Sequence, residues 1–173
     1  MKPSDTKARI QAVAREMFVA QGVPNTSLQQ IADRLGITKA ALYYHFASRD
    51  ELVRSVIQPF LDDLERFVAE RGPGDIRQLL ADYFDLIWQY RDVIMMVLHA
   101  PAVLMELELF DRMWQWRLQL TTLLIGPEPT VAAQIHATVA LGGMSDCAVE
   151  HAHLPFDEVK AAATDAALAA LHR

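Results

Sequence analysis

The sequence predicts an all-α protein, in which an N-terminal three-helix helix-turn-helix unit precedes a helical bundle, with about nine helices altogether. Apolar residues recur with the 3.6-residue period of a helix in almost every segment, and no run of alternating β-branched residues interrupts them. The 173 residues are 52% hydrophobic and include only 7 Gly and 8 Pro. The chain can therefore bury a core, and intrinsic disorder is excluded.

Caps and breakers define the first two predicted helices. The first follows Pro3 and ends at Gly22. Ser27 and Gln30 have the spacing of a capping box, so a second helix of about two turns begins there. It is expected to end at Gly36, because glycine is favoured at the left-handed position that follows a helix.

The next two helices are also predicted from their capping residues. Thr38 is placed to cap a third short helix, from Lys39 to about Phe46. Ser48 and Glu51 form a further capping box that starts a fourth helix, expected from about Arg49 to Arg71.

Proline and glycine organise the rest of the chain. Pro59 removes a backbone hydrogen bond inside the fourth helix and predicts a kink near Ser55. The clearest break is at residues 72–74, Gly-Pro-Gly. The helices expected beyond it are one that restarts at Asp75, a short one near Val93–His99, a long one around Val103–Ile125, one from Thr130 to about Ala152, and an alanine-rich one from about Asp157.

Charge and cysteine content narrow the class of protein. The single cysteine, Cys147, cannot form an internal disulfide, no secretion signal is evident, and the longest apolar run is too short to span a bilayer, so a cytoplasmic location is expected. The net charge of −6 argues against a nucleic-acid partner. However, residues 1–50 carry 7 Lys and Arg against 4 Asp and Glu, whereas residues 51–173 carry 9 against 18. Residues 1–50 therefore form a mildly basic head, and residues 51–173 form an acidic body.

The third short helix has an unusual outward face. Leu42 and Phe46 are expected to point inward, which leaves a cation, a small residue and two hydroxyl-bearing rings outside: Lys39, Ala40, Tyr43 and Tyr44. Two short helices joined by a tight turn form a helix-turn-helix, whose second helix can enter a DNA major groove.

The run from Ile31 to Leu52, which reads IADRLGITKAALYYHFASRDEL, resembles the signature of TetR-type (tetracycline-repressor-like) transcriptional regulators. The resemblance covers Thr26 to Leu52, with the preceding helix in register. It implies a DNA-binding domain in residues 1–47 and an effector-binding and dimerisation domain in residues 48–173. It also implies a ligand-responsive regulator, a repressor more readily than an activator, that binds a palindromic operator as a homodimer and is released by a small apolar or amphipathic effector.

The resemblance also implies roles for individual residues at the DNA. Lys39, Ala40 and Tyr43 occupy positions that face bases and the nearby backbone. The positions at phosphates or the groove edge are Thr38, Tyr44, His45 and Arg49. Backbone N–H groups of Thr26 and Ser27, at the start of the second helix, are expected to favour a phosphate. His45 could instead cap the end of its own helix.

The remaining two-thirds of the chain resembles the family only in the number and order of its helices. Adaptable apolar residues in its middle predict an effector pocket, with plain core as the alternative: Phe60, Leu64, Phe84, Trp88, Met95, Met96, His99, Phe110, Met113 and Trp114. Trp114 and Trp116 diverge on a helix, so at most one is expected to face inside. Small residues predict a dimer interface, with packing inside one subunit as the alternative: Ala140, Gly142, Gly143, Ala163 and Ala167.

Catalytic and metal-binding patterns are not found in the sequence. No histidine pair has metal-ligand spacing, and no Gly-rich phosphate loop, nucleophile elbow or HExxH pattern occurs. The sequence therefore predicts neither an enzyme nor a cofactor. Two alternatives to a regulator stay open: a ligand-sequestering helical carrier, and a module that binds a protein partner through its apolar pocket.

Overall fold

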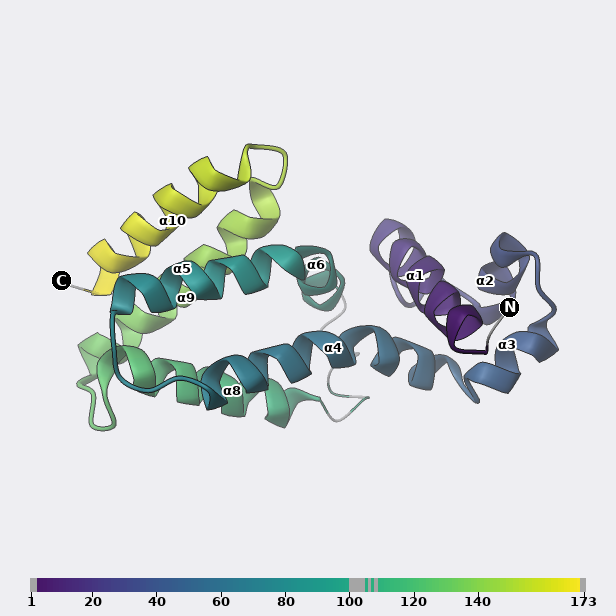
Figure 1. Ribbon diagram of the computed structural model, residues 1–173, viewed down its shortest axis with the longest axis horizontal. Coiled ribbons are helices and arrows are strands. Elements are labelled where there is room, and N and C mark those ends of the chain that lie inside the picture. The colour runs from purple at the N-terminus through teal and green to yellow at the C-terminus, as the bar shows by residue number, and fades with distance from the viewer. Residues whose placement is uncertain (1–2, 100–104, 106, 108, 172–173) are drawn as a thin grey trace. The chain divides into compact units, whose positions relative to one another are not determined.

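The computed structural model describes residues 3–99, 105, 107 and 109–171, and the described residues form nine α-helices without a strand (Figure 1). The helices are α1 (Pro3–Gln21), α2 (Leu28–Leu35), α3 (Lys39–His45), α4 (Arg49–Ala69), α5 (Ile76–Gln89), α6 (Arg91–His99), α8 (Phe110–Ile125), α9 (Val131–Glu150) and α10 (Phe156–Leu171). The predicted fold class is confirmed. None of these described helices is long and apolar enough to cross a lipid bilayer.

The chain divides into two compact units. The first contains the residues up to Leu61 together with the described part of 95–110, and the second contains 62–94 and 111–171. The division expected from the sequence, at residues 47 and 48, stays a prediction about function.

The first unit is built on the predicted apolar stripes. α1 buries Ile10, Ala14 and Phe18 on one face, as their spacing requires. α2 buries Ile31, and α3 buries Leu42 against the same core. α1, α2 and α3 therefore share one small hydrophobic core.

The start of α4 differs in detail from the predicted capping box. The Glu51 N–H donates to Ser48 Oγ at 3.0 Å, as expected. The Glu51 carboxylate, however, accepts from the N–H of Ala47 at 2.7 Å, one residue before the expected donor. The helix still begins at Arg49, because one orphan N–H of its first turn and one N–H of the preceding loop have both found acceptors.

Pro59 lies inside α4 and leaves the carbonyl of Ser55 without its usual helical donor. Gln11 of α1 donates through Nε2 to this carbonyl at 3.3 Å. The missing backbone bond is thus replaced by a side chain from another helix, which ties α1 to α4 within the first unit.

In the second unit, α5, α9 and α10 pack on one another (Figure 1). Tyr83 and Phe84 of α5 are among its largest fully buried side chains. α9 and α10 present small buried residues to the core, and these include Ala137 and Ala148 on α9. Small side chains permit the close approach of helix backbones that a core of this kind requires.

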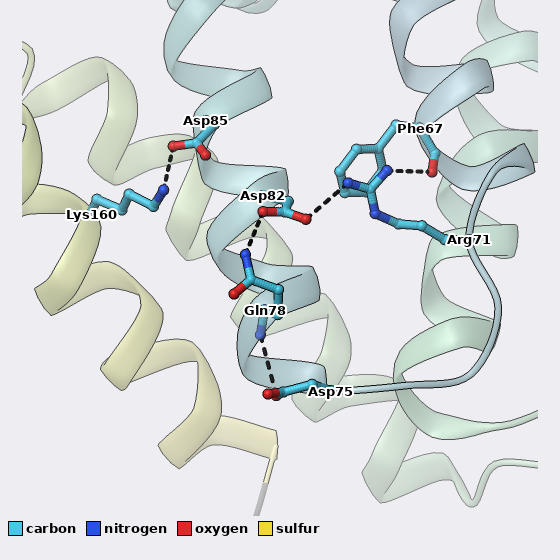
Figure 2. Close-up of polar contacts among 7 residues, drawn as sticks. All are labelled: Phe67, Arg71, Asp75, Gln78, Asp82, Asp85 and Lys160. Atoms are coloured by element: carbon cyan, nitrogen blue, oxygen red, sulfur yellow. Dashed lines mark hydrogen bonds and ion pairs between the residues drawn. The ribbon is translucent and has the colours of Figure 1, made fainter.

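A polar network joins the end of α4 to α5 (Figure 2). The Arg71 guanidinium lies 3.7 Å from the centroid of the Phe67 ring and donates to the Phe67 carbonyl and to Asp82. Gln78, whose N–H donates to the capping carboxylate of Asp75, also donates to Asp82. Although burial acts to raise the pKa of Asp82, the hydrogen bonds from Arg71 and Gln78 outweigh it and lower that pKa.

One predicted boundary is wrong. The long helix expected from about Val103 begins at Phe110, while Leu107 and Leu109 lie in a turn and in irregular chain. Both leucines are buried. Residues two apart on a helix point in opposite directions, so burying both in one core favours a non-helical backbone. The expected start at Val103 itself falls outside the described residues.

Candidate nucleic-acid interface

The turn between α2 and α3 is shaped by one glycine. Gly36 has φ 66° and ψ 31°, the left-handed conformation, and its N–H donates to the last turn of α2. A Cβ at this position would meet no atom within 4 Å, so the backbone angle and not crowding demands glycine. Thr38 then caps α3, accepting from the N–H of Ala41 at 3.1 Å. Both predicted caps are confirmed.

α3 presents the outward face that the sequence predicts. Leu42 is fully buried and Phe46 is buried beside it, while Lys39 and Ala40 are exposed. Tyr43 and Tyr44 expose 45% and 81% of their surface. Large aromatic rings this exposed are unusual in a chain that can bury them, so this face is suited to contact with a partner.

Three segments converge around a hollow of about 440 Å³ in the first unit. Its walls come from the start of α2, from α3 and from the start of α4, and they include Ser27, Gln29, Lys39, Tyr43 and Arg49. The Lys39 ammonium lies 5.8 Å from the centroid of the Tyr43 ring. Cations and hydroxyls therefore line one concave surface.

Arg49 is the most informative residue of the hollow. Its Nε is buried and has no hydrogen-bond partner in the part of the chain that the structure describes. A buried donor without an acceptor costs about 1–3 kcal/mol. A guanidinium is also a bidentate donor for phosphate, so Arg49, which lines the hollow, is suited to hold a phosphate there.

The backbone donors at the start of α2 divide into bonded and free N–H groups. The N–H of Thr26 donates to the Val23 carbonyl at 3.2 Å, and the N–H of Ser27 donates to Gln30 Oε1 at 2.8 Å. The preceding turn and the capping box thus use these two N–H groups, and a phosphate contact of Thr26 or Ser27 stays a prediction. The N–H groups of Leu28 and Gln29 have no acceptor among the described residues.

The side chain of Thr26 is buried and serves the loop itself. Its Oγ1 donates to the Gly22 carbonyl at 2.8 Å and accepts from Gln21 Nε2 at 3.1 Å. Thr26 thus holds the turn that presents α2. A direct role of this residue at DNA stays a prediction.

Tyr44 and His45 lie at the end of α3 with their rings edge to face, 5.2 Å between centroids. His45 is half-buried, and Tyr44 is the more exposed of the pair. Neither the expected phosphate contact nor the alternative, a capping role for His45, is decided by this geometry.

The ten residues predicted for an effector pocket are spread over both units and do not line one described cavity. Four are buried: Phe60, Leu64, Phe84 and Met96. Three are half-buried: Trp88, Met95 and Met113. Phe110 and Trp114 are exposed, and the side chain of His99 lies outside the described residues.

The two tryptophans of α8 separate as their spacing predicts. Trp116 is 5% exposed and Trp114 is 55% exposed. The inward residue is Trp116, and its Nε1 is buried with no hydrogen-bond partner among the described residues. Near it, the hydroxyl of Tyr83 pairs with Ser145 Oγ at 3.2 Å, and burial raises the pKa of Tyr83.

Trp88 belongs to an aromatic cluster in the second unit. Its ring centroid lies 5.8 Å from that of Phe84 and 5.3 Å from that of Phe156. Sequence reasoning missed Phe156, because it stands at the start of α10, far along the chain from the other two rings. Only the packing of α10 on α5 brings it there.

The predicted dimer residues are mostly covered within one chain. Ala140, Ala163 and Ala167 are buried, Gly142 is half-buried and Gly143 is exposed. α9 instead exposes a stripe of larger apolar side chains at i, i+4 and i+8, namely Val131, Ile135 and Val139. Ala140, Ala163 and Ala167 pack inside the subunit, which leaves this stripe, with Gly143, as the open apolar surface of α9.

Comparison with known proteins identifies the first helices. Residues 10–56 match the family model described as bacterial regulatory proteins, tetR family. Over 53 residues the chain is 45% identical to TtgW of Pseudomonas putida, an uncharacterized HTH-type transcriptional regulator. Over 61 residues it is 34% identical to the HTH-type transcriptional repressor KstR2 of Mycolicibacterium smegmatis.

These matches are local. They cover 31% and 35% of this chain, and the chain spans only 40% and 30% of the length of the two relatives. The fold extends further, because a transcriptional regulator of Aquifex aeolicus superposes with a TM-score of 0.77 over 93% of this chain and 96% of that one, at 20% identity. The sequence relationship thus lies in the helix-turn-helix, and the likeness beyond it is one of fold.

Proposed function

We propose that the protein is a transcriptional regulator that binds a palindromic DNA operator as a homodimer, because its N-terminal helices match the family model of bacterial regulatory proteins, tetR family. The observation that carries the proposal is the exposed face of α3, with Lys39 and Tyr43 beside a hollow that Arg49 also lines. A repressor released by a small effector is the form that we propose.

In this proposal α3 enters the major groove. Lys39 is a cation that suits guanine or a phosphate, and Ala40 is small enough to let the helix approach the base edges. The exposed rings of Tyr43 and Tyr44 offer hydroxyl donors and apolar contact with thymine methyl groups.

The hollow is proposed to hold a backbone phosphate. The guanidinium of Arg49 and the free N–H groups of Leu28 and Gln29, at the N-terminus of α2, would then donate to one anion. The capped end of α2 adds its partial positive charge to this site. The mildly basic head, with a net charge of +3 over residues 1–50, supports the same arrangement.

A homodimer is proposed through the open stripe of α9, formed by Val131, Ile135 and Val139. Such side chains lose little by exposure singly, but three in one row make a contiguous apolar strip that a second copy would cover. Two recognition helices in a dimer must lie about 34–36 Å apart to read adjacent half-sites.

Effector release is proposed to act by population shift. A ligand in the C-terminal part of the chain must prefer one state by about 5.5 kcal/mol to move the equilibrium from 1:99 to 99:1. The aromatic cluster around Trp88 and the unpaired indole N–H of Trp116 support binding of an apolar or amphipathic molecule there. The cytoplasmic location predicted from the sequence suits a DNA-binding regulator.

Selection from a random duplex library, followed by titration of the selected DNA at several salt concentrations, tests the proposal. The variant Lys39→Ala with Tyr43→Ala is expected to lose at least about tenfold in affinity, and its salt slope is expected to fall by about 1, because one phosphate-neutralising cation is gone. Arg77→Ala, at an exposed cation of α5, serves as the matched control and is expected to bind like wild type. If no duplex is selected, or if the double variant binds unchanged, the regulator proposal fails and a ligand carrier becomes the better explanation.

A further inference from the structure

The second unit contains a surface pocket apart from the aromatic cluster. It has a volume of about 340 Å³ and lies between α8, α9 and the loop that joins them. Trp114, Arg117 and Leu118 form the α8 wall, Pro127 belongs to the loop, and Gln134 lies on α9. This volume is within the range of small-molecule sites.

Arg117 is exceptional among the cations described in the second unit, because it has no hydrogen bond or ion pair there. The other described Lys and Arg side chains of this unit all have partners: Arg66, Arg71, Arg77, Arg91, Arg112 and Lys160. The one electrostatic effect of Arg117 on a described neighbour is on the buried hydroxyl of Tyr83. Carboxylates are abundant in this unit, yet Arg117 pairs with none of the described ones. It lies instead at the pocket.

The lining of the pocket contains no acidic residue. This is notable because residues 51–173 carry 18 Asp and Glu against 9 Lys and Arg. Arg117 is therefore the one charged residue in the lining of the pocket, while the exposed Glu128 lies in the loop between the lining residues Pro127 and Pro129. A site of this kind selects ligands that carry their negative charge at one end.

The apolar part of the pocket lies next to Arg117 on the same helix. Trp114 precedes it by three residues and so shares its face of α8, and Leu118 is adjacent. Both apolar side chains are about half exposed. An indole and a leucine held open to solvent beside a guanidinium match a molecule with an apolar body and an anionic group.

We propose that this pocket binds an amphipathic organic anion, with its carboxylate or sulfonate on Arg117 and its apolar body on Trp114 and Leu118. Arg–carboxylate pairs are commonly bidentate, which gives the ligand a fixed orientation. The site lies on the outward side of α8, opposite the buried Trp116, so it is distinct from the aromatic cluster around Trp88.

A ligand in this pocket has a physical route to α4. On α8, one and a half turns before Arg117, Arg112 donates to Glu65 at 2.8 Å and to Asp62 at 3.2 Å, both on α4. The hydrogen bond to Glu65 is the main cause that raises the pKa of Arg112. α4 is the helix that begins at Arg49. The role of the pocket as an effector site rests on the proposed function, whereas binding of the anion does not.

Calorimetric titration of the full chain, without DNA, tests the binding. The probes are 2-naphthoate and its neutral analogue 2-naphthamide. Wild type is expected to bind naphthoate at least about tenfold more tightly, because a hydrogen bond to a charged group is stronger than one to a neutral group. Arg117→Gln is expected to abolish this preference, and Trp114→Ala is expected to weaken both probes. Arg77→Gln, at a paired and exposed arginine of the same unit, is the control and is expected to match wild type.

Equal affinity of wild type for the two probes, or a preference that survives Arg117→Gln, overturns the proposal. Helix content and thermal unfolding are measured on each variant, and Arg117→Lys, which keeps the charge, is expected to retain the preference for naphthoate even if Arg117→Gln is poorly folded. If Trp114→Ala changes the monomer–dimer equilibrium and leaves probe binding unchanged, the pocket is a subunit contact and the proposal is wrong. Operator binding is measured separately, so its loss would refute the proposed function without touching the anion site.

Discussion

Replacing Arg49 by methionine should stabilise the protein while weakening its binding to DNA. The Nε of Arg49 is buried without an acceptor among the described residues, and methionine fills a similar volume without any donor. Removing an unsatisfied donor relieves about 1–3 kcal/mol. Arg49 also stands in the first turn of α4, where a cation opposes the helix dipole by about 0.3–1 kcal/mol. Both terms have the same sign.

We therefore expect Arg49→Met to raise the free energy of unfolding by about 1–3 kcal/mol in urea titrations at pH 7. The same variant is expected to bind the selected duplex more weakly at every salt concentration, with a salt slope reduced by about 0.9. The control is Arg77→Met, which removes an exposed ion pair with Asp165 and should change unfolding by less than about 1 kcal/mol. If Arg49→Met instead lowers the free energy of unfolding by 1 kcal/mol or more, Arg49 supports the fold and the phosphate argument is refuted.

Three further outcomes are expected. Gly36→Ala should lower the free energy of unfolding by about 1–2 kcal/mol, because alanine is strained at φ 66°. Gly143→Ala, inside α9 with open space around it, should raise the free energy of unfolding by up to about 1 kcal/mol. Urea titrations that give the two changes the same sign would contradict this. Asp82 has a lowered pKa, so its ionised form stabilises the fold at neutral pH, and this contribution is lost as the pH falls below about 4. The difference in unfolding free energy between wild type and Asp82→Asn should therefore shrink from pH 7 to pH 3. A constant difference would argue against the ionised pair of Asp82 with Arg71. Ile135→Glu should shift sedimentation from dimer to monomer at unchanged helix content, since Ile135 is 56% exposed in one chain, and an unchanged dimer would exclude this stripe as the interface.

Local signals predicted most of the first unit correctly. The caps at Ser27 and Thr38 and the left-handed conformation of Gly36 depend only on residues within about four positions along the chain. A short window of the sequence is therefore enough to predict them. The same holds for the inward Leu42 and the outward Tyr44, because helical periodicity alone sorts them.

Predictions failed where the answer depends on segments that are distant in the chain. The helix expected from about Val103 begins at Phe110, after Leu107 and Leu109, which are both buried in the completed core. For the small residues of α9 and α10 the sequence left open both a dimer interface and packing inside one subunit, and the burial of Ala140 and Ala163 in the single chain favours packing inside the subunit. A stripe of alanines indicates that another helix packs closely against it, but it does not show which helix this is.

By itself, the sequence determined that this chain is helical and that residues 26–52 form a helix-turn-helix with the tetR-family pattern, because caps, turns and periodicity are local properties. Only the tertiary structure decided that Arg49 lacks a partner beside the hollow and that Arg117 is left unpaired beside Trp114. Whether a charged group is satisfied depends on every residue that folding brings within a few ångströms of it. That sum over distant segments is not contained in any window of the sequence.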